Sequence, residues 1–116
     1  MQQSAIWSGK SGNAYVTVRY DLGAPAPALP AVCVAVRGGA GRRRVVAVLA
    51  VDDARAAFGP DGAPGQALAR QGADEVHLWF DVGRTPVREE IAADLAAALG
   101  PFRPDTAPTA ARRRVA

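Results

Sequence analysis

The chain has a single cysteine, Cys33, and a single histidine, His77, and these shortages exclude several kinds of site. One cysteine forms no internal disulfide, and one cysteine with one histidine is too few for a zinc site of four cysteines or of mixed ligands. No apolar run approaches the roughly 18 residues of a membrane span. Residues 1–12 also lack the cationic start and apolar stretch of a secretory signal. We therefore expect a cytoplasmic protein with no membrane contact.

Large apolar side chains are also scarce, although 49% of the 116 residues count as hydrophobic. Alanine supplies 26 of these residues, so the core must be built mainly from valine and a few larger side chains. Such a chain fills one modest core, and we expect a single domain over residues 14–103. Residues 1–13 are then an N-terminal segment, and residues 104–116 are a basic tail that we expect to be flexible.

The pattern of apolar residues predicts an α+β fold, in which helices pack on a small and mostly antiparallel sheet. Strands are predicted at residues 14–20, 31–37, 45–51 and 75–81. The second and third form a hairpin across a glycine-rich turn, and the third is apolar on both faces, which predicts a central position in the sheet. Helices are predicted at residues 54–58 with Asp52 as N-cap, at 66–71 with Gly72 as C-terminal cap, and from Thr85 to the glycine at position 100.

The net charge of +3 comes mainly from two arginine runs, Arg42–Arg44 and Arg112–Arg114. Arginines that neutralise phosphates release counterions and give a salt-sensitive affinity for nucleic acid. The same runs are also typical of a solvated tail and of a charged hairpin end. Both interpretations stay open, and Lys10 joins these arginines as a candidate nucleic-acid contact.

Two arrangements look like sites but lack a required feature. The segment Ser8–Gly12 ends like a phosphate-binding loop, but Ser4 replaces the first glycine of that motif, and a strand rather than a helix follows. Cys33 and His77 have the chemistry of a nucleophile and its base, but both fall inside strands and no third group orients the ring. We therefore predict a structured turn for the first and packing roles for the second.

Adjacent carboxylates and tryptophans have equally ordinary explanations. Side chains of neighbouring helical residues diverge by about 100°, so the pairs Asp52–Asp53 and Glu89–Glu90 are poorly placed to share a metal ion. Acidic residues in the first turn of a helix are explained by capping and by the helix dipole. Trp7 and Trp79 have the rings that stack on bases, but packing in the core explains them as well. No metal site, cofactor site or small-molecule substrate is identified.

The chain as a whole resembles small bacterial proteins related to the GIY-YIG nucleases. The resemblance rests on residues spread from about position 7 to position 104: Trp7, Gly9–Gly12, Ala14-Tyr15, Tyr20, Leu22-Gly23, Gly72-Ala73, Val76-His77 and Asp94-Leu95. It implies two strands that carry the family motifs, helices after them, and a third strand before a helix that bears a metal-binding glutamate. It also implies catalysis by two tyrosines, an arginine, that glutamate and often an asparagine.

The residues at the implied catalytic positions do not have the required side chains. Alignment by the quoted motifs places the following at those positions: Cys33, Ala47, Ala57, Ala92 and Gly100. A register slip of two or three residues would bring Glu89 or Glu90 to the glutamate position, but it would restore neither tyrosine. Without a carboxylate there is no ligand for the Lewis-acid ion, and without tyrosine there is no hydroxyl to activate water. The resemblance therefore implies a pseudoenzyme and no nuclease activity.

Two functions remain as hypotheses. The first is a non-catalytic protein-interaction or structural module that binds a protein partner or self-associates as a homodimer. It rests on the apolar residues at the implied catalytic positions, because a surface lined by such residues suits a protein better than a phosphate. The alternative is a nucleic-acid-binding protein that has lost cleavage and binds through Lys10 and the two arginine runs.

Overall fold

The computed structural model describes residues 3–38, 43–80 and 85–99, and it confirms the predicted α+β class. Eight elements follow one another along the chain: β1 (Gln3–Ser8), β2 (Ala14–Asp21), β3 (Ala31–Arg37), β4 (Arg44–Val51), α1 (Ala54–Phe58), α2 (Ala63–Arg70), β5 (Glu75–Phe80) and α3 (Thr85–Leu99). The strands form one antiparallel sheet in the order β1-β2-β5-β3-β4. Within these ranges no helix has both the length and the apolar character that crossing a membrane requires.

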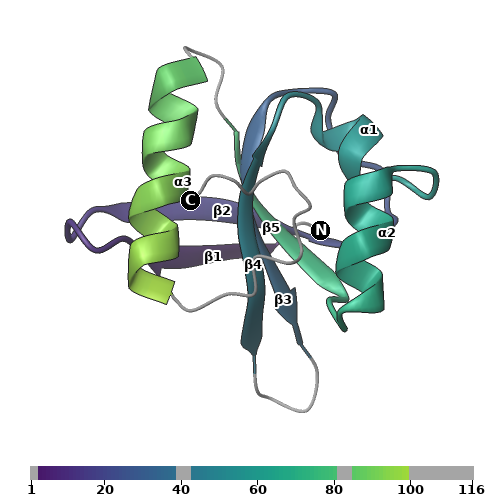
Figure 1. Ribbon diagram of the computed structural model, residues 1–116, viewed down its shortest axis with the longest axis horizontal. Helices are drawn as coiled ribbons and strands as arrows, with labels where there is room; N and C mark the ends of the chain where they lie inside the picture. The colour runs from purple at the N-terminus through teal and green to yellow at the C-terminus, as the bar shows by residue number, and fades with distance from the viewer. Residues whose placement is uncertain (1–2, 39–42, 81–84, 100–116) are drawn as a thin grey trace.

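Helices cover both faces of the sheet. Figure 1 shows α3 on one side of the strands and the pair α1 and α2 on the other. The period-two alternation of β3 divides its side chains between these faces, so Ala31, Cys33 and Ala35 lie under α1 and α2 while the intervening valines lie under α3. All six residues from Ala31 to Val36 are completely buried. The β3 strand is therefore the centre of the core, a position that the sequence pattern predicts for residues 45–51 instead.

Each face has its own apolar core. Small side chains of β3 allow Phe58 of α1 and Leu68 of α2 to pack closely against Leu78 of β5. On the other face, the β3 valines pack against Leu95 of α3, with Trp79 of β5 at the periphery. The many alanines thus let two thin layers of helix approach one sheet, which is how an alanine-rich chain of this length buries a core on both sides.

The structure corrects the predicted position of the strand at residues 45–51. This strand, β4, is at the edge of the sheet, because β5 inserts between β2 and β3 and leaves β4 paired with β3 alone. Its apolar character on both faces has another cause. Leu49 and Val51 pack under α1 and α2, and Val45 and Val48 pack under α3, so helices cover both faces of an edge strand.

The N-terminal segment also differs from the expectation. Residues 3–8 form β1, which pairs with β2 from Gln3 opposite Arg19 to Ser8 opposite Ala14. The turn between them includes Gly12 in the left-handed region, at φ 95°. Four of its six residues are exposed, and its sequence has no apolar face long enough to indicate a strand. The predicted tail, residues 104–116, lies outside the described residues.

Helix boundaries follow the predicted signals with two changes. The side chain of Asp53, rather than that of Asp52, caps α1 by accepting a hydrogen bond from the backbone N–H of Ala56. The helix α2 begins at Ala63, three residues earlier than predicted. Gly72 follows α2 at φ 99°, the left-handed conformation predicted for it.

Candidate functional site

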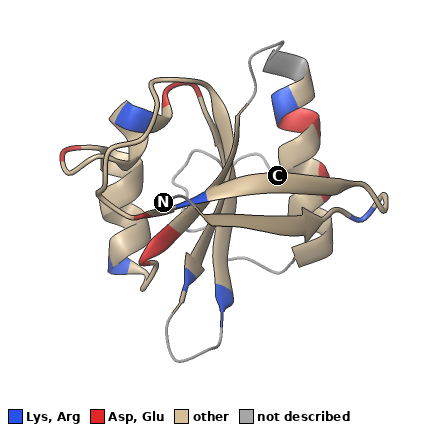
Figure 2. Ribbon diagram, turned by 180° about the vertical axis from the view of Figure 1, so that it is seen from behind, with Lys and Arg blue, Asp and Glu red and all other residues tan. Residues whose placement is uncertain are grey.

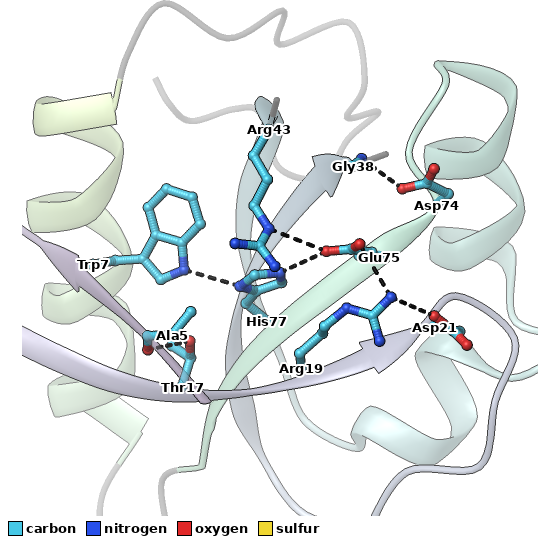
Figure 3. Close-up of polar contacts among 10 residues, drawn as sticks. All are labelled: Ala5, Trp7, Thr17, Arg19, Asp21, Gly38, Arg43, Asp74, Glu75 and His77. Atoms are coloured by element: carbon cyan, nitrogen blue, oxygen red, sulfur yellow. Dashed lines mark hydrogen bonds and ion pairs between the residues drawn. The ribbon is translucent and has the colours of Figure 1, made fainter. Parts of the chain in front are cut away.

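Glu75, at the start of β5, is a buried carboxylate with three hydrogen-bonding partners (Figure 3). Its side chain is only 10% exposed and lies on the face of the sheet that carries His77. One carboxylate oxygen, Oε1, accepts from Nε2 of His77 at 3.0 Å and from Nε of Arg43 at 3.4 Å. The other, Oε2, accepts from Nη2 of Arg19 at 3.1 Å. Arg19 also binds the exposed carboxylate of Asp21 at 2.8 Å.

These partners keep the Glu75 carboxylate ionised. Burial alone raises the pKa of a carboxyl group, because it disfavours the charged form. Here the hydrogen bond from His77 and the hydrogen bond and positive charge of Arg19 outweigh burial, and they lower the pKa of Glu75 to about 2. Glu75 is therefore an anion throughout the physiological range and has no proton to give as a general acid.

His77 is completely buried, and both of its ring nitrogens are engaged. Its Nδ1 accepts a hydrogen bond from Nε1 of Trp7 at 3.2 Å, while Nε2 faces Glu75. The indole N–H is only a donor, so Nδ1 carries no proton and the ring is the neutral Nε2–H form. Burial lowers the pKa of His77 more than the hydrogen bond to Glu75 raises it. A ring in this state has no path to a substrate and no free nitrogen for one.

The Glu75 cluster, defined as Trp7, Arg19, Arg43, Glu75 and His77, connects separate parts of the sheet. Figure 3 shows its side chains coming from β1, β2 and β5 and from the position just before β4. The solvent-exposed members are the guanidinium groups, with side chains 26% exposed in Arg19 and 48% exposed in Arg43. The Glu75 cluster links β1, β2, β5 and the position just before β4 by hydrogen bonds and ion pairs. It presents no nucleophile or base to solvent.

A second polar site forms where the β1–β2 turn meets α3. The carboxylate of Asp94 accepts hydrogen bonds from the backbone N–H of Ser11 at 2.8 Å, from its Oγ at 2.7 Å and from the hydroxyl of Tyr15 at 2.7 Å. The backbone N–H of Lys10 donates to the carbonyl of Asp94 at 3.1 Å. A Cβ on Gly9 would collide with the same carboxylate.

The turn that resembles the end of a phosphate loop therefore binds a carboxylate from its own chain. The hydrogen bonds from Tyr15 and Ser11 lower the pKa of Asp94, because they favour its charged form. The sequence indicates a structured turn here but gives no sign of its partner, since Ser11 and Asp94 are 83 positions apart.

The structure separates Cys33 from His77. Cys33 packs under α1 and α2, whereas the His77 ring lies on the opposite face with Glu75. Burial raises the pKa of the Cys33 thiol well above its usual range, so the thiol is protonated and inert. The predicted packing role of this residue agrees with its position in the core.

The paired acidic residues act separately too. Asp53 caps α1, and Asp52 accepts from Nη2 of Arg88 at 2.7 Å across to α3. Both tryptophans pack against the core under α3. Among the described residues, no three histidine, cysteine, aspartate or glutamate side chains are grouped so that they could hold a metal ion.

The positions implied by the nuclease resemblance do not form one surface. Cys33, Ala47 and Ala57 pack in the core under α1 and α2. Ala92 packs on the other side of the sheet with α3. Gly100 lies outside the described residues.

The predicted nucleic-acid contacts are also apart. Lys10 is exposed in the β1–β2 turn, and Arg43 and Arg44 are exposed at the start of β4, where Arg44 is opposite Arg37 of β3. Figure 2 shows the lysine and arginine positions distributed over several elements instead of along one face. Arg42, Arg112, Arg113 and Arg114 lie outside the described residues.

One apolar surface is left uncovered. Ile6 of β1 and Val16 of β2 are opposite each other in the ladder and are 67% and 59% exposed. Figure 2 views this hairpin from the side away from α3, and no helix covers it there. The sequence predicts a strand over residues 14–20 but does not indicate this exposed pair.

A shallow cavity of about 500 Å³ opens at the end of β4. It lies where β4, α1, α2 and α3 come together, because its lining residues include members of all four elements. Its lining residues are Ala50, Val51, Asp52, Asp53, Ala56, Ala57, Pro64, Arg88 and Glu89.

Comparison with known proteins finds no match: no protein family, no curated protein and no solved structure matches this chain. Its function is therefore argued from its own residues.

Proposed function

We propose that the chain is a non-catalytic domain on a GIY-YIG-like scaffold and that it acts as a protein-interaction module. Its contact surface is the uncovered face of the β1–β2 hairpin around Ile6 and Val16. The observation that carries the proposal is the exposure of these two directly paired apolar side chains, at 67% and 59%. Exposed apolar side chains that are neighbours, rather than scattered singly, are where we expect a protein partner to bind.

The state of the reactive groups supports the non-catalytic part of this proposal. The His77 ring is enclosed with both nitrogens engaged, and the Cys33 thiol is buried and protonated. Glu75 and Asp94 are held as anions by donors of the same chain. These groups stabilise contacts between elements of the fold. We therefore place the function on the exposed surface around Ile6 and Val16.

A photo-crosslinking amino acid tests the contact surface directly. We expect a crosslinker at Ile6 to capture a discrete protein partner in the cells that make this chain. The matched control carries the same crosslinker at Leu29, which is 37% exposed in the loop before β3. The exchange Val16→Thr should reduce capture from position 6, because it replaces apolar contact area with a hydroxyl. Equal, diffuse labelling from positions 6 and 29 would refute the proposed surface.

A second candidate, nucleic-acid binding, is favoured by one observation. Arg37 and Arg44 are directly opposite each other at the end of the β3–β4 hairpin, next to Arg43. Like charges in opposite positions repel, so a bound anion would stabilise this end of the hairpin. Fluorescence anisotropy with labelled DNA and RNA at low and moderate salt tests this candidate. Binding that weakens with salt and with Arg44→Gln would support it, and no binding at low salt would end it.

A further inference from the structure

The composition of β4 does not match its position at the edge of the sheet. Residues 45–51 contain no charged side chain and no proline. Edge strands usually carry such residues, because an open row of backbone N–H and C=O groups otherwise pairs with another chain. One bulge interrupts the β4 ladder: Ala35 is opposite Ala47 and Val36 is opposite Val45, which leaves Val46 as the extra residue. The strand beyond it, from Ala47 to Val51, is regular.

The free side of β4 is open in the part of the chain that the structure describes. Figure 1 looks onto this edge, with α3 on one side and α1 and α2 on the other. Within residues 3–38, 43–80 and 85–99, β4 forms backbone hydrogen bonds in its ladder with β3 and takes part in no turn, loop or cap bond. The cavity described above is lined in part by Ala50 and Val51, at the C-terminal end of this strand.

The charges at the two ends of β4 are opposite in sign, and this makes a second copy of the same strand a suitable partner for its free edge. Arg43 and Arg44 stand at its start, and Asp52 and Asp53 follow its end. Arg44 is exposed, and the side chain of Asp52 is 94% exposed. A strand that pairs antiparallel with a copy of itself places the start of each beside the end of the other. Arg44 of one chain would therefore face Asp52 of the second at both ends of the contact, while Arg43 and Asp53 keep their contacts with Glu75 and with the start of α1.

We infer that β4 pairs with β4 of a second copy of this chain, antiparallel about a two-fold axis near Val48, so that the two sheets continue into one. The strand is self-complementary in apolar character and in charge, which is what an isologous contact requires. An unrelated peptide would have to present the same basic, apolar and acidic order. The bulge at Val46 shifts the register of the two paired β4 strands by one residue. The basic end of each strand still lies beside the acidic end of the other.

This interface is separate from the surface around Ile6 and Val16 and does not depend on the proposed function. Sedimentation equilibrium of the full chain should give twice the 12.0 kDa chain mass at high concentration and a dimer that weakens with salt. Arg44→Asp should raise the dimer dissociation constant by roughly tenfold, because two symmetry-related pairs change from attraction to repulsion. The matched control, Ile6→Ser with Val16→Thr, should leave the constant unchanged.

A mixing experiment tests whether the basic end of one β4 strand pairs with the acidic end of the other. Asp52→Arg also weakens its own homodimer, since Arg44 of one chain then faces a second guanidinium group on the other. An equimolar mixture with Arg44→Asp should recover a heterodimer close to wild-type affinity, because the exchanged contact again joins opposite charges. Circular dichroism spectra and melting curves check that both variants fold. If Asp52→Arg unfolds through repulsion from Arg88, Arg44→Asp and the exchange measurement below carry the test.

Hydrogen exchange identifies the strand involved. The β4 amides that point away from β3 should become protected as the protein concentration rises, while the outward-pointing amides of the other edge strand, β1, should not. Three outcomes would overturn the inference: a monomer at every concentration tested, a dimer that Arg44→Asp leaves unchanged, or protection of the outward-pointing β4 amides that is independent of concentration. The last would mean that another segment of the same chain covers the edge.

Discussion

Replacing Glu75 with glutamine should destabilise the protein by an amount that the structure allows us to estimate. Glutamine has the size of a protonated glutamate and no charge, so Glu75→Gln removes the anion that Arg19, Arg43 and His77 share. Arg19 would keep the exposed carboxylate of Asp21 as its charged partner. The loss should therefore measure what the charged carboxylate contributes to the folded state.

The magnitude follows from the depressed pKa of Glu75. A fall from the ordinary value of 4.5 to about 2 in the folded protein corresponds to roughly 3 kcal/mol at neutral pH, at about 1.4 kcal/mol for each pKa unit. This agrees with the ~3–5 kcal/mol typical of breaking a buried ion pair. Because the folded pKa lies below the unfolded one, the contribution is complete above about pH 4.5 and is lost as the pH falls from 4.5 towards 2.

Urea unfolding at one fixed protein concentration provides the assay. At pH 7 we expect Glu75→Gln to lower the free energy of unfolding by about 3 kcal/mol, and near pH 2 the variant and the wild type should be almost equally stable. The control is Asp21→Asn, which removes a carboxylate 70% exposed on the same arginine and should cost at most ~1 kcal/mol. A loss below about 1 kcal/mol for Glu75→Gln, or a loss that is the same at pH 7 and pH 2, would refute this account.

Two further predictions concern His77 and the β1–β2 turn. Because burial lowers the pKa of His77, the unfolded ring takes up a proton below about pH 6.5 and the folded ring does not, so stability should decrease as the pH falls below that value. Nuclear magnetic resonance of the ring nitrogens should show the neutral Nε2–H form, and a folded ring that titrates at or above pH 6.5 would contradict this. Gly9→Ala should destabilise the wild type, because its Cβ displaces the Asp94 carboxylate from its donors. In an Asp94→Ala background the same exchange should cost almost nothing, and additive losses in a double-mutant cycle would count against the contact.

Local signals in the sequence predicted most of the fold. Alternating residues located β2, β3 and β5, and the complete burial of β3 agrees with its two apolar faces. The left-handed Gly72 and the helix from Thr85 follow from short-range preferences that need no distant partner. Such signals depend on a few neighbouring residues, and they are present in the chain before it folds.

The candidate site was much less predictable. Cys33 and His77 were expected to pack and both are buried, but no local pattern places Trp7 beside His77, which lies 70 positions later. The partnership of Ser11 with Asp94 is equally distant. Hydrogen bonds and ion pairs of this kind leave no periodic signal, because each depends on one pair of side chains that only the finished sheet brings together.

The scarcity of cysteine and histidine determined by itself that no internal disulfide and no cysteine- and histidine-based zinc site forms. The sequence also determined that β4 is covered on both faces, since its side chains are apolar on both. Only the tertiary structure decided that β4 is an edge strand, because the order of strands depends on where β5 inserts. The side-chain pattern of a strand depends on whether its two faces are covered. Its neighbours in the sheet are joined to it by backbone hydrogen bonds, which every residue type except proline can donate, so the sequence pattern does not specify them.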